Sequence, residues 1–563
     1  MLGVETRGNY NTLLDAVALK AGDGHPAIIF RETAQPPIVV TRHQFRQRVH
    51  AYCVALKTVG ICPRDLVVIA HTQNLESIYL FWAVMMAGAI PSMFPTLTEK
   101  LDPAVYMSSM AELTRLSDVA AVLTTDEFAP ALRNHLPCVV FGTAELFANE
   151  TTVGPTEFPV IQADPADIAF LQHSSGTTGL QKGVALSHSS VLNQISAYSD
   201  TILLRPNDVI ASWLPLYHDM GLIAGFLLPL VQGIPLVLMS PFDWVTHPAL
   251  LLQAIHDHEA TLCWLPNFAY NHCARRIRRR DSEGLSLATM RLFVNCSEPV
   301  HHESHQQFLE RFAQNGVRNK MLGVSYAMAE NTFAVTQTSP GRPASLDFIS
   351  NESLTARGYA QPLESGDPAS VVKVSCGSAI PGTEVKIVNS AGREMEDRTV
   401  GEIVIRSNCL LSGYFKRPDL QPIDSFGWYH TGDIGYMVDD QLYVIGRQKD
   451  LIISAGKNIY PADIEAIVNT IKGVHAGRAV AFGVDDEREG TELIAVVAEV
   501  STTDDDEKRS IAREIRQEIA RQSMVNVSYV HLVGPRWLLK TSSGKITRNA
   551  NKEKWLQESH RTG

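Results

Sequence analysis

The stretch LQHSSGTTGLQKGVALSH, from Leu171 to His188, gathers three glycines, five small hydroxyl residues and a lysine. Glycine lets a backbone approach an anion closely, and backbone N–H groups with Ser and Thr hydroxyls can surround phosphate oxygens. The segment is not a Walker A loop, because Lys182 lies between Gln181 and Gly183 instead of in a Gly-Lys-Ser/Thr run. Two interpretations stay open from these residues alone, a phosphate-binding loop and a flexible surface turn.

The composition is that of an ordinary globular protein. The chain has 563 residues, of which 45% are hydrophobic and 19% charged, so we expect several domain-sized units. Its formal net charge of −11 argues against a general nucleic-acid binder, which must neutralise phosphates. The run CARRIRRRD is a local exception, and it is either a solvated helix face or a docking site for an acidic partner. Its arginines are Arg275, Arg276, Arg278, Arg279 and Arg280.

The cysteines and the apolar segments predict a cytoplasmic protein without a transmembrane segment. The eight cysteines form no Cys-x-x-Cys pair and no His/Cys cluster at zinc spacing. The first residues, MLGVETRGNYNTLLDAV, do not resemble a secretory signal. Pro229, Gly233 and Pro235 interrupt the most apolar stretch, IAGFLLPLVQGIPLVLMSPF. We therefore expect a buried helix, a turn and a core strand there.

Alternating helix-like and strand-like segments predict an α/β fold. Residues 64–71 predict a strand, 77–89 a helix and 90–95 a second strand, which together make a β-α-β unit. Residues 119–125 and 137–142 predict further short buried strands, and 383–389 and 401–407 predict a strand pair with alternating faces.

Two segments are interpreted as connections. The stretch from Thr338 to Ser370 is polar, rich in turn residues and unusually long for a loop in a compact domain. Gly446 to Asp450 separates a strand-like run from a hairpin-like one, after which the chain predicts a small α/β unit. We therefore predict a large N-terminal domain over residues 1–445, a hinge over 446–450 and a small C-terminal domain over 451–563.

Four further segments carry residue types suited to catalysis. They are SWLPLYHDMGL with Trp213, Tyr217, His218 and Asp219; GVSYAMAENT with Tyr326 and Glu330; YHTGDIGY with Asp433; and KTSSGKITR with Lys545. Each has an ordinary alternative, because a buried histidine, an aspartate in a turn and a surface lysine are common in proteins without any catalytic role.

In this order the motifs resemble the adenylate-forming (AMP-binding) superfamily, which includes acyl-CoA synthetases, adenylation domains, luciferases and fatty acyl-AMP ligases. The resemblance runs from NYNTLLDAV to GKITR and rests on the opening stretch, LPLYHDMG, SYAMAE, TGD, GRQKD and the late GK. It implies that the opening stretch is the ATP phosphate-binding loop. It also implies a large multi-subdomain N-terminal domain followed by a small, mobile α/β C-terminal domain.

The resemblance implies a site for ATP and Mg²⁺. A carboxylate must attack the α-phosphorus of ATP, so positioning and charge neutralisation must supply most of the catalysis. Glu330 is implied to hold Mg²⁺ and Tyr326 to stack on adenine. Asp433, supported by Arg447, would accept hydrogen bonds from the ribose hydroxyls. The other implied ATP-binding residues are Ser174, Ser175, Gly176, Thr177, Thr178, Gly179 and Lys182 at the phosphates, and Ser297 and Glu298 along the purine.

The resemblance further implies that the C-terminal domain swings between two half-reactions. Lys545 would be the mobile catalytic cation, reaching the substrate carboxylate and the α-phosphate as the acyl-adenylate forms. Lys449 of GRQKD falls at the hinge position, and His218 corresponds to a gate between the acyl pocket and the thiol path. The first conformation would make the adenylate and the second would admit a thiol.

Two departures from the commonest pattern bear on the subfamily. Ala327 replaces a usual Gly, and Ala329 replaces a frequent Thr but is common in fatty acyl-AMP ligases. Glu330 and Gly377 are 47 positions apart, more than we expect of a typical acyl-CoA synthetase. The segment LDFISNESL…VSCGSAIPG between them resembles an insertion of the fatty acyl-AMP ligases. In that subfamily the insertion is thought to hinder the domain rotation that transfer to CoA requires. The resemblance implies activation of a medium- or long-chain fatty acid as acyl-AMP, then transfer to the phosphopantetheine thiol of an acyl carrier protein.

Other functions remain as alternatives. An acyl-CoA synthetase would differ only in using CoA as the acceptor, and a bioluminescent monooxygenase would share the adenylate. A non-catalytic adenylate-binding module is disfavoured by the intact Glu330, Asp433, Arg447 and Lys545. Two apolar runs, Phe226 to Pro229 and CWLPNFAY, could line a tunnel for an alkyl chain or could simply be core residues. The chain length of the acid therefore stays open.

Overall fold

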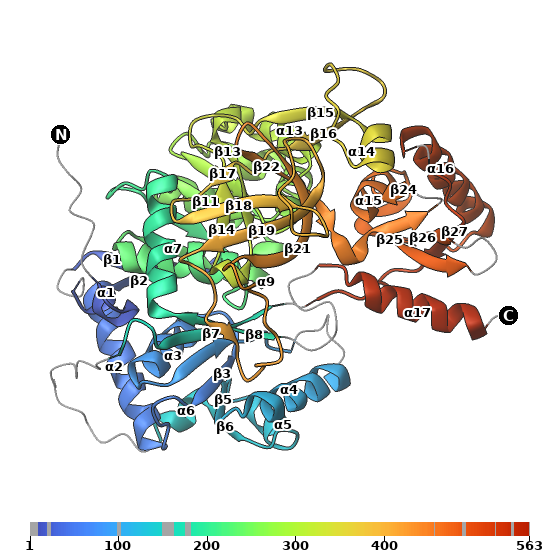
Figure 1. The fold of residues 1–563 in the computed structure, drawn as a ribbon. Helices are drawn as coiled ribbons and strands as arrows, with labels where there is room; N and C mark the ends of the chain where they lie inside the picture. Colours follow the sequence, from blue (N-terminus) through green and yellow to red (C-terminus); the bar gives the residue numbers. More distant parts are fainter. Residues whose placement is uncertain are drawn as a thin grey trace.

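The computed structural model describes residues 10–19, 24–97, 103–148, 163–174, 182–454, 457–486, 491–523, 525–541 and 545–561. They form two large mixed sheets, a smaller antiparallel sheet and a C-terminal unit beside them (Figure 1). The predicted α/β fold is confirmed. Among the residues described, none of the helices has the length and apolarity that a bilayer crossing requires.

The first large sheet has nine strands and is mostly parallel. In spatial order they are β17 (Ser378–Ala379), β14 (Ala334–Gln337), β13 (Leu322–Ala327), β12 (Leu292–Asn295), β11 (Leu262–Leu265), β9 (Ile210–Ser212), β10 (Leu236–Met239), β1 (Pro26–Arg31) and β2 (Ile38–Thr41). The antiparallel pairs lie at its two ends.

The second large sheet has seven strands. In spatial order they are β20 (Gly413–Tyr414), β8 (Lys182–Ser187), β7 (Ile168–Ser174), β4 (Ile90–Met93), β3 (Leu66–Ala70), β5 (Ala121–Thr124) and β6 (Val139–Gly142). β3 and β4 are parallel and joined by α3 (Leu75–Met86), which confirms the predicted β-α-β unit. α3 is buried on every side from Ser77 to Met86, because it lies between this sheet and the segment around Phe226.

The remaining helices of the large part cover these sheets. They are α1 (Leu13–Leu19), α2 (Arg42–Thr58), α4 (Pro103–Ser117), α5 (Ala129–Arg133), α6 (Thr143–Leu146), α7 (His188–Thr201), the π-helix η1 (Met220–Leu227), α8 (Leu228–Gln232), α9 (Pro241–Thr246), α10 (Ala249–Asp257), α11 (Asn267–Arg276), α12 (Arg279–Ser282), α13 (His302–Phe312), and the 3₁₀ turns η2 (Ala313–Asn315), η3 (Asn319–Met321) and η4 (Ala329–Asn331). The most apolar stretch is the expected buried helix, left-handed turn at Gly233 and core strand, although its helix begins as a π-helix.

The antiparallel sheet leads to the predicted hinge. Its strands are β18 (Thr383–Val388), β19 (Gly401–Ser407), β21 (Tyr429–Val438) and β22 (Gln441–Arg447), and β18 pairs with β19 as predicted. The 3₁₀ turn η5 (Gln448–Asp450) follows β22 directly and precedes the hairpin of β23 (Ile452–Ser454) and β24 (Lys457–Ile459).

The C-terminal unit builds its own two hydrophobic cores on one sheet. The elements are α15 (Pro461–Val468), β25 (Val474–Asp486), β26 (Thr491–Val500), α16 (Asp505–Ser523), β27 (Tyr529–Val533) and α17 (Arg548–Arg561). Alternate residues of β25 face opposite sides, as strand geometry requires. Ala479 and Ala481 pack in the core that contains α15 and α16 residues, and Val480 and Phe482 pack in the core that contains Trp555 of α17. The predicted boundaries at residues 445 and 451 stay a prediction. The separate cores of the C-terminal unit support them.

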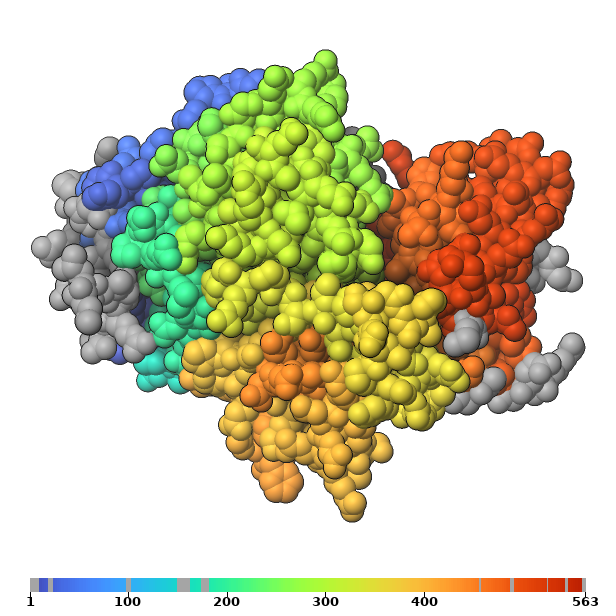
Figure 2. Space-filling model, turned by 90° about the horizontal axis from the view of Figure 1, so that it is seen from above, coloured from blue at the N-terminus to red at the C-terminus, as the bar shows by residue number. Residues whose placement is uncertain are grey.

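The polar segment from Thr338 to Ser370 is not a plain connection. It contains β15 (Leu346–Ser350) and α14 (Asn351–Arg357), and β15 pairs antiparallel with β16 (Ser370–Val374). The sequence did not reveal this small β-α-β insertion. Its strands are only half buried, so they lack a strong apolar pattern, and many turn residues surround them. In the space-filling view the yellow insertion lies against both the large part and the red C-terminal unit (Figure 2).

Candidate active site

The ends of the opening stretch are held in register by two strands. β7 ends at Ser174 and β8 begins at Lys182, and these two residues pair across the antiparallel ladder. Lys182 Nζ lies 5.0 Å from the ring centroid of Tyr414, which is on the neighbouring strand β20. The loop residues Ser175, Gly176, Thr177, Thr178 and Gly179, and the side chain of Ser174, lie outside what the structure describes.

Tyr326, Asp433 and Arg447 meet at the junction of the first large sheet and the antiparallel sheet. The Tyr326 hydroxyl donates a hydrogen bond of 2.6 Å to Asp433 Oδ2, and Arg447 Nε lies 3.3 Å from Asp433 Oδ1. The ladder between β21 and β22 places Asp433 opposite Arg447. Burial raises the pKa of Asp433, although Arg447 and the Tyr326 hydroxyl oppose that change. The sequence predicted these three residues as one nucleotide site, and the structure brings them together.

Glu330 is held by a pair of tyrosines that sequence reasoning missed. The Tyr414 hydroxyl donates a hydrogen bond of 3.1 Å to Glu330 Oε1, and the Tyr429 hydroxyl lies 3.1 Å from that of Tyr414. Burial raises the pKa of Glu330, so its carboxylate is unfavourable without a cation nearby. Tyr414 occurs in the segment SGYFKRPD, which gives no chemical signal by itself.

A single buried carboxylate fits Mg²⁺ that is held mainly by a nucleotide. Mg²⁺ usually keeps several waters and binds one or two carboxylates together with substrate phosphates. Among the described residues, no group of three or more His, Cys, Asp or Glu side chains is arranged to hold a metal. Glu330 therefore suits a metal ion that arrives with ATP.

His218 and Asp219 lie at the start of the π-helix η1. Asp219 Oδ1 accepts a hydrogen bond of 2.7 Å from the Met220 N–H and lies 2.6 Å from His218 Nδ1. Burial opposes ionisation of Asp219, but His218, Lys545 and the Met220 N–H together lower its pKa. Lys545 belongs to the C-terminal unit, so its charge acts across the two parts of the chain. The predicted catalytic lysine and the predicted gate thus lie within electrostatic reach of the same carboxylate.

Arg447, Lys182 and Lys449 lie within electrostatic reach of one another near the predicted hinge. Burial, and then the charges of Arg447 and Lys182, lower the pKa of Lys449, while Asp433 and Asp450 act in the opposite direction. Lys449 lies in η5, at the predicted hinge. Because like charges placed close together are unfavourable, this grouping suits a polyanion that binds among them.

Ser297 and Glu298 occupy the loop after β12, but the structure gives Glu298 another contact. Ser297 adopts a left-handed backbone with φ of 71°, and its hydroxyl lies 3.6 Å from Cys296 Sγ. Glu298 Oε2 accepts a hydrogen bond of 3.0 Å from the Phe268 N–H in the first turn of α11. A carboxylate there satisfies an unpaired N–H and interacts favourably with the helix dipole. The purine contact of Glu298 stays a prediction beside this capping role.

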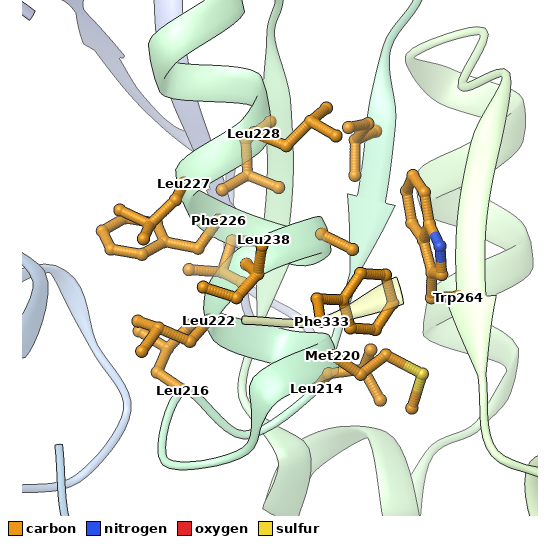
Figure 3. Packing of buried hydrophobic residues seen from close by; sticks show 14 of the residues in the cluster. Leu214, Leu216, Met220, Leu222, Phe226, Leu227, Leu228, Leu238, Trp264 and Phe333 are labelled. Carbon is orange, nitrogen blue, oxygen red and sulfur yellow. The ribbon is translucent and has the colours of Figure 1, made fainter. Parts of the chain in front are cut away.

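The apolar stretch that was open to two interpretations packs as core. Leu222, Phe226 and Leu227 are fully buried, and Figure 3 shows them among other buried apolar side chains of the cluster, such as Leu216 and Leu238. The Phe226 ring lies 6.1 Å from that of Phe81 in α3. These contacts favour the core interpretation for Phe226.

Comparisons with known proteins bear on the family of the chain. The model of the AMP-binding enzyme family matches residues 14–415. The chain is 33% identical to the 4-hydroxyphenylalkanoate adenylyltransferase of Mycobacterium tuberculosis, over 87% of this chain and 82% of that protein. It is 30% identical to the long-chain-fatty-acid–AMP ligase FadD28 of the same organism, over 88% of each chain.

Solved structures extend the similarity to the whole fold. A structure from a study of the fatty acyl-adenylate ligases of E. coli and L. pneumophila superposes with a TM-score of 0.89, at 29% identity and 99% coverage of each chain. The L. pneumophila fatty acyl-adenylate ligase in complex with acyl adenylate and pyrophosphate superposes with a TM-score of 0.74, at 27% identity over 99% of this chain and 98% of that one. The chain belongs to the AMP-binding enzyme family, and within it resembles the fatty acyl-AMP ligases.

Proposed function

We propose that the protein activates a medium- or long-chain fatty acid with ATP and then transfers the acyl group to the phosphopantetheine thiol of an acyl carrier protein. In the first step a carboxylate oxygen bonds to the α-phosphorus of ATP and the bond to pyrophosphate breaks, giving acyl-AMP. In the second step the thiolate sulfur bonds to the acyl carbon and AMP leaves. The observation that carries this proposal is the contact of Tyr326, Asp433 and Arg447 at one site, with the charge of Lys545 from the C-terminal unit acting on Asp219.

The nucleotide end of the site supports the first step. Asp433 would accept hydrogen bonds from the ribose hydroxyls, with Arg447 holding its carboxylate in place. Tyr326 would lie along the adenine, and Lys182 would meet the phosphates together with the loop before it. Glu330, held by Tyr414, would bind Mg²⁺, which supplies charge neutralisation at the phosphates.

The place where the fatty carboxylate meets the α-phosphate requires a cation that still lets the fatty acid enter. A fatty carboxylate and the α-phosphate repel each other until a positive charge lies between them. Lys545 has a long flexible side chain and comes from a separate unit, so it can approach that point after both substrates have bound. His218, paired with Asp219, lies beside the same point and would separate the acyl group from the incoming thiol.

The contacts of the insertion support a carrier protein over CoA as the acceptor. Asp347 of β15 binds the large part through Arg398, at 3.0 Å, and through the Tyr436 hydroxyl, at 2.9 Å. Lys373 of β16 reaches the C-terminal unit, where its ammonium lies 2.8 Å from Asp463 of α15. The insertion is therefore anchored on one side and holds the C-terminal unit on the other. This opposes the rotated arrangement that thiol transfer requires, so an acceptor must supply binding energy of its own.

The test uses purified protein and a panel of acids. ATP–pyrophosphate exchange should appear with medium- or long-chain fatty acids and Mg²⁺, and CoA and a phosphopantetheinylated carrier protein should then be compared as acceptors. The panel should include 4-hydroxyphenylalkanoates because of the relative that bears that name. Absence of exchange with every acid would favour a non-catalytic adenylate-binding module. Efficient acyl-CoA formation would favour the CoA-dependent alternative.

A further inference from the structure

Arg548 connects the end of the hinge to two other segments of the C-terminal unit. Its Nη2 donates to both carboxylate oxygens of Glu465 in α15, at 2.8 and 3.0 Å, and its Nη1 donates to Asp450 Oδ2 at 2.5 Å. Its Nε donates to the Ala481 carbonyl of β25 at 2.9 Å. The side chains of Arg548, Asp450 and Glu465 are 20%, 12% and 18% exposed, so this is a mostly buried cluster.

The cluster links the end of the hinge to the segment that carries Lys545. Asp450 is the residue after Lys449, and Arg548 lies three residues after Lys545. Between them the chain passes through the whole C-terminal unit, yet one side chain joins the two ends directly. The planar guanidinium can hold two carboxylates in fixed directions, which a single ammonium cannot do.

The Lys545 segment is also attached to the strand-like residues before it: Lys540 and Ile546 form an antiparallel bridge, and the Thr547 N–H donates to the Leu539 carbonyl at 3.1 Å. Thr541 N–H donates to the Lys545 carbonyl at 2.7 Å, and Lys545 N–H donates to Thr541 Oγ1 at 3.1 Å, so these two residues hold each other. Asn551 fixes Leu539 with hydrogen bonds of 2.8 and 2.9 Å. These contacts hold the segment to its neighbours within the C-terminal unit, and Arg548, the first residue of α17, adds the attachment to the hinge.

We propose that Arg548 is a positioning residue that fixes the base of the Lys545 turn to Asp450, so that rotation at Lys449 carries Lys545 toward or away from Asp219 as one rigid unit. This inference rests on the proposed adenylation, in which Lys545 acts on the reacting carboxylate and phosphate. A displacement of about 1 Å in a catalytic group can lower a rate about 10²-fold.

The first test is a double-mutant cycle. Arg548→Gln should lower the kcat of acyl-AMP formation about 10²-fold in the wild-type background, with little change in the KM for ATP. In the Lys545→Ala background the same substitution should change kcat less than about threefold, because its effect is transmitted through Lys545. A loss of equal size in both backgrounds would mean that Arg548 serves only stability, and would overturn the proposal.

Two further variants guard against a folding defect. Arg548→Lys keeps the buried positive charge but loses the fork, so it should fold and still lose much of the kcat. Arg521→Gln is the matched control, because Arg521 makes a forked pair with Glu518 on the exposed face of α16 in the same unit. Normal kcat in Arg548→Lys, or a comparable loss in Arg521→Gln, would contradict the positioning role.

A measurement without catalysis separates this inference from the proposed function. Hydrogen exchange of the backbone amides in residues 545–551 should be faster in Arg548→Lys than in the wild type, and unchanged in Arg521→Gln. If the wild-type protein makes no acyl-AMP, the proposed function fails, and the exchange data alone decide whether Arg548 holds this segment. Unchanged exchange in Arg548→Lys would overturn the inference.

Discussion

At the scale of single residues, the candidate site keeps carboxylates where burial opposes their charge. Asp433 and Glu330 both have raised pKa values, and burial is the main cause for each. Such an arrangement disfavours folding at neutral pH, and it is typical of groups retained for binding or catalysis. The two residues therefore allow binding and stability to be separated by experiment.

Asp433→Asn should weaken ATP binding without weakening the fold. Losing a charged acceptor from the ribose should raise the KM for ATP about 10- to 100-fold. The folded pKa of Asp433 is above its ordinary value, so the folded state keeps a proton that the unfolded state has already released. Wild-type stability should then rise as pH falls through the raised pKa, and the variant should melt at or above the wild-type temperature at pH 7. A clear drop in melting temperature with an unchanged KM would identify an ordinary structural aspartate.

Lys545→Ala should affect the chemical step. Removing one preorganised cation should lower acyl-AMP formation about 10²–10³-fold. Nucleotide affinity should change little, because the proposed ATP contacts of Asp433, Tyr326 and Lys182 lie in the large part. Single-turnover formation of acyl-AMP together with equilibrium ATP binding measures the two effects separately. A variant with near-normal acyl-AMP formation would remove Lys545 from the mechanism.

Some site residues could be predicted from the sequence and others could not, for a physical reason. Tyr326, Asp433 and Arg447 occur in compact motifs, and the structure places them in contact. Tyr414 and Arg548 act through side chains that are distant in sequence, Glu330 and Asp450, so no local spacing reveals them. Glu298 caps α11, a contact that depends on how two loops meet.

At the scale of secondary-structure elements, predictability followed the strength of local periodicity. β3, α3 and β4 are mostly apolar and were predicted within a few residues. The π-helix η1 was predicted only as a buried helix. Hydrophobic content does not distinguish an α-helix, with hydrogen bonds between residues four apart, from a π-helix, with bonds between residues five apart. The insertion was concealed because its half-buried strands pair with each other and not with a main sheet.

The ion pair between the insertion and the C-terminal unit should influence the choice of acceptor. Breaking a partly exposed pair is worth about 1 kcal/mol or less, so Lys373→Ala should raise acyl-CoA formation by up to about fivefold. Shortening the segment from Thr338 to Ser370 removes the larger steric obstacle. If the rotated arrangement is disfavoured by about 2–3 kcal/mol, this change should raise acyl-CoA formation roughly 30- to 150-fold while adenylation persists.

A charge-swap experiment provides the control for this element. Lys373→Asp combined with Asp463→Lys should return acyl-CoA formation toward the wild-type level, because the opposite charges meet again. Lys386 of β18 forms an ion pair with Glu394, away from the C-terminal unit. Breaking this pair with Lys386→Ala should leave acyl-CoA formation unchanged. If shortening the insertion leaves acyl-CoA formation unchanged, the insertion does not control the acceptor.

At the scale of the whole molecule, the charge distribution bears on the proposed carrier protein. The formal net charge is −11, so an acidic partner is repelled by most of the surface. The arginine run at the end of α11 and in α12 is exposed at all five arginines. Arg278 and Arg280 share one carboxylate, that of Asp281, at 2.8 and 3.6 Å. Burial and then the charge of Arg279 lower the pKa of Arg311. This surface therefore retains uncompensated positive charge.

Transfer to an acidic carrier protein should depend on this surface and on salt, whereas adenylation should not. Arg275→Glu combined with Arg276→Glu should raise the KM for the carrier about 10-fold or more, mainly by slowing association, and should leave ATP–pyrophosphate exchange and transfer to CoA unchanged. Raising the salt from 0.05 to about 0.5 M should weaken wild-type transfer to the carrier, because exposed charges are screened beyond about 10 Å at 0.1 M. The charge-reversed variant should respond much less to salt. Arg513→Glu, on the exposed face of α16, is the matched control for adding negative charge to the molecule. If this control impairs carrier transfer as strongly as the arginine-run variant, the effect comes from net charge, and the arginine run is only a solvated helix face.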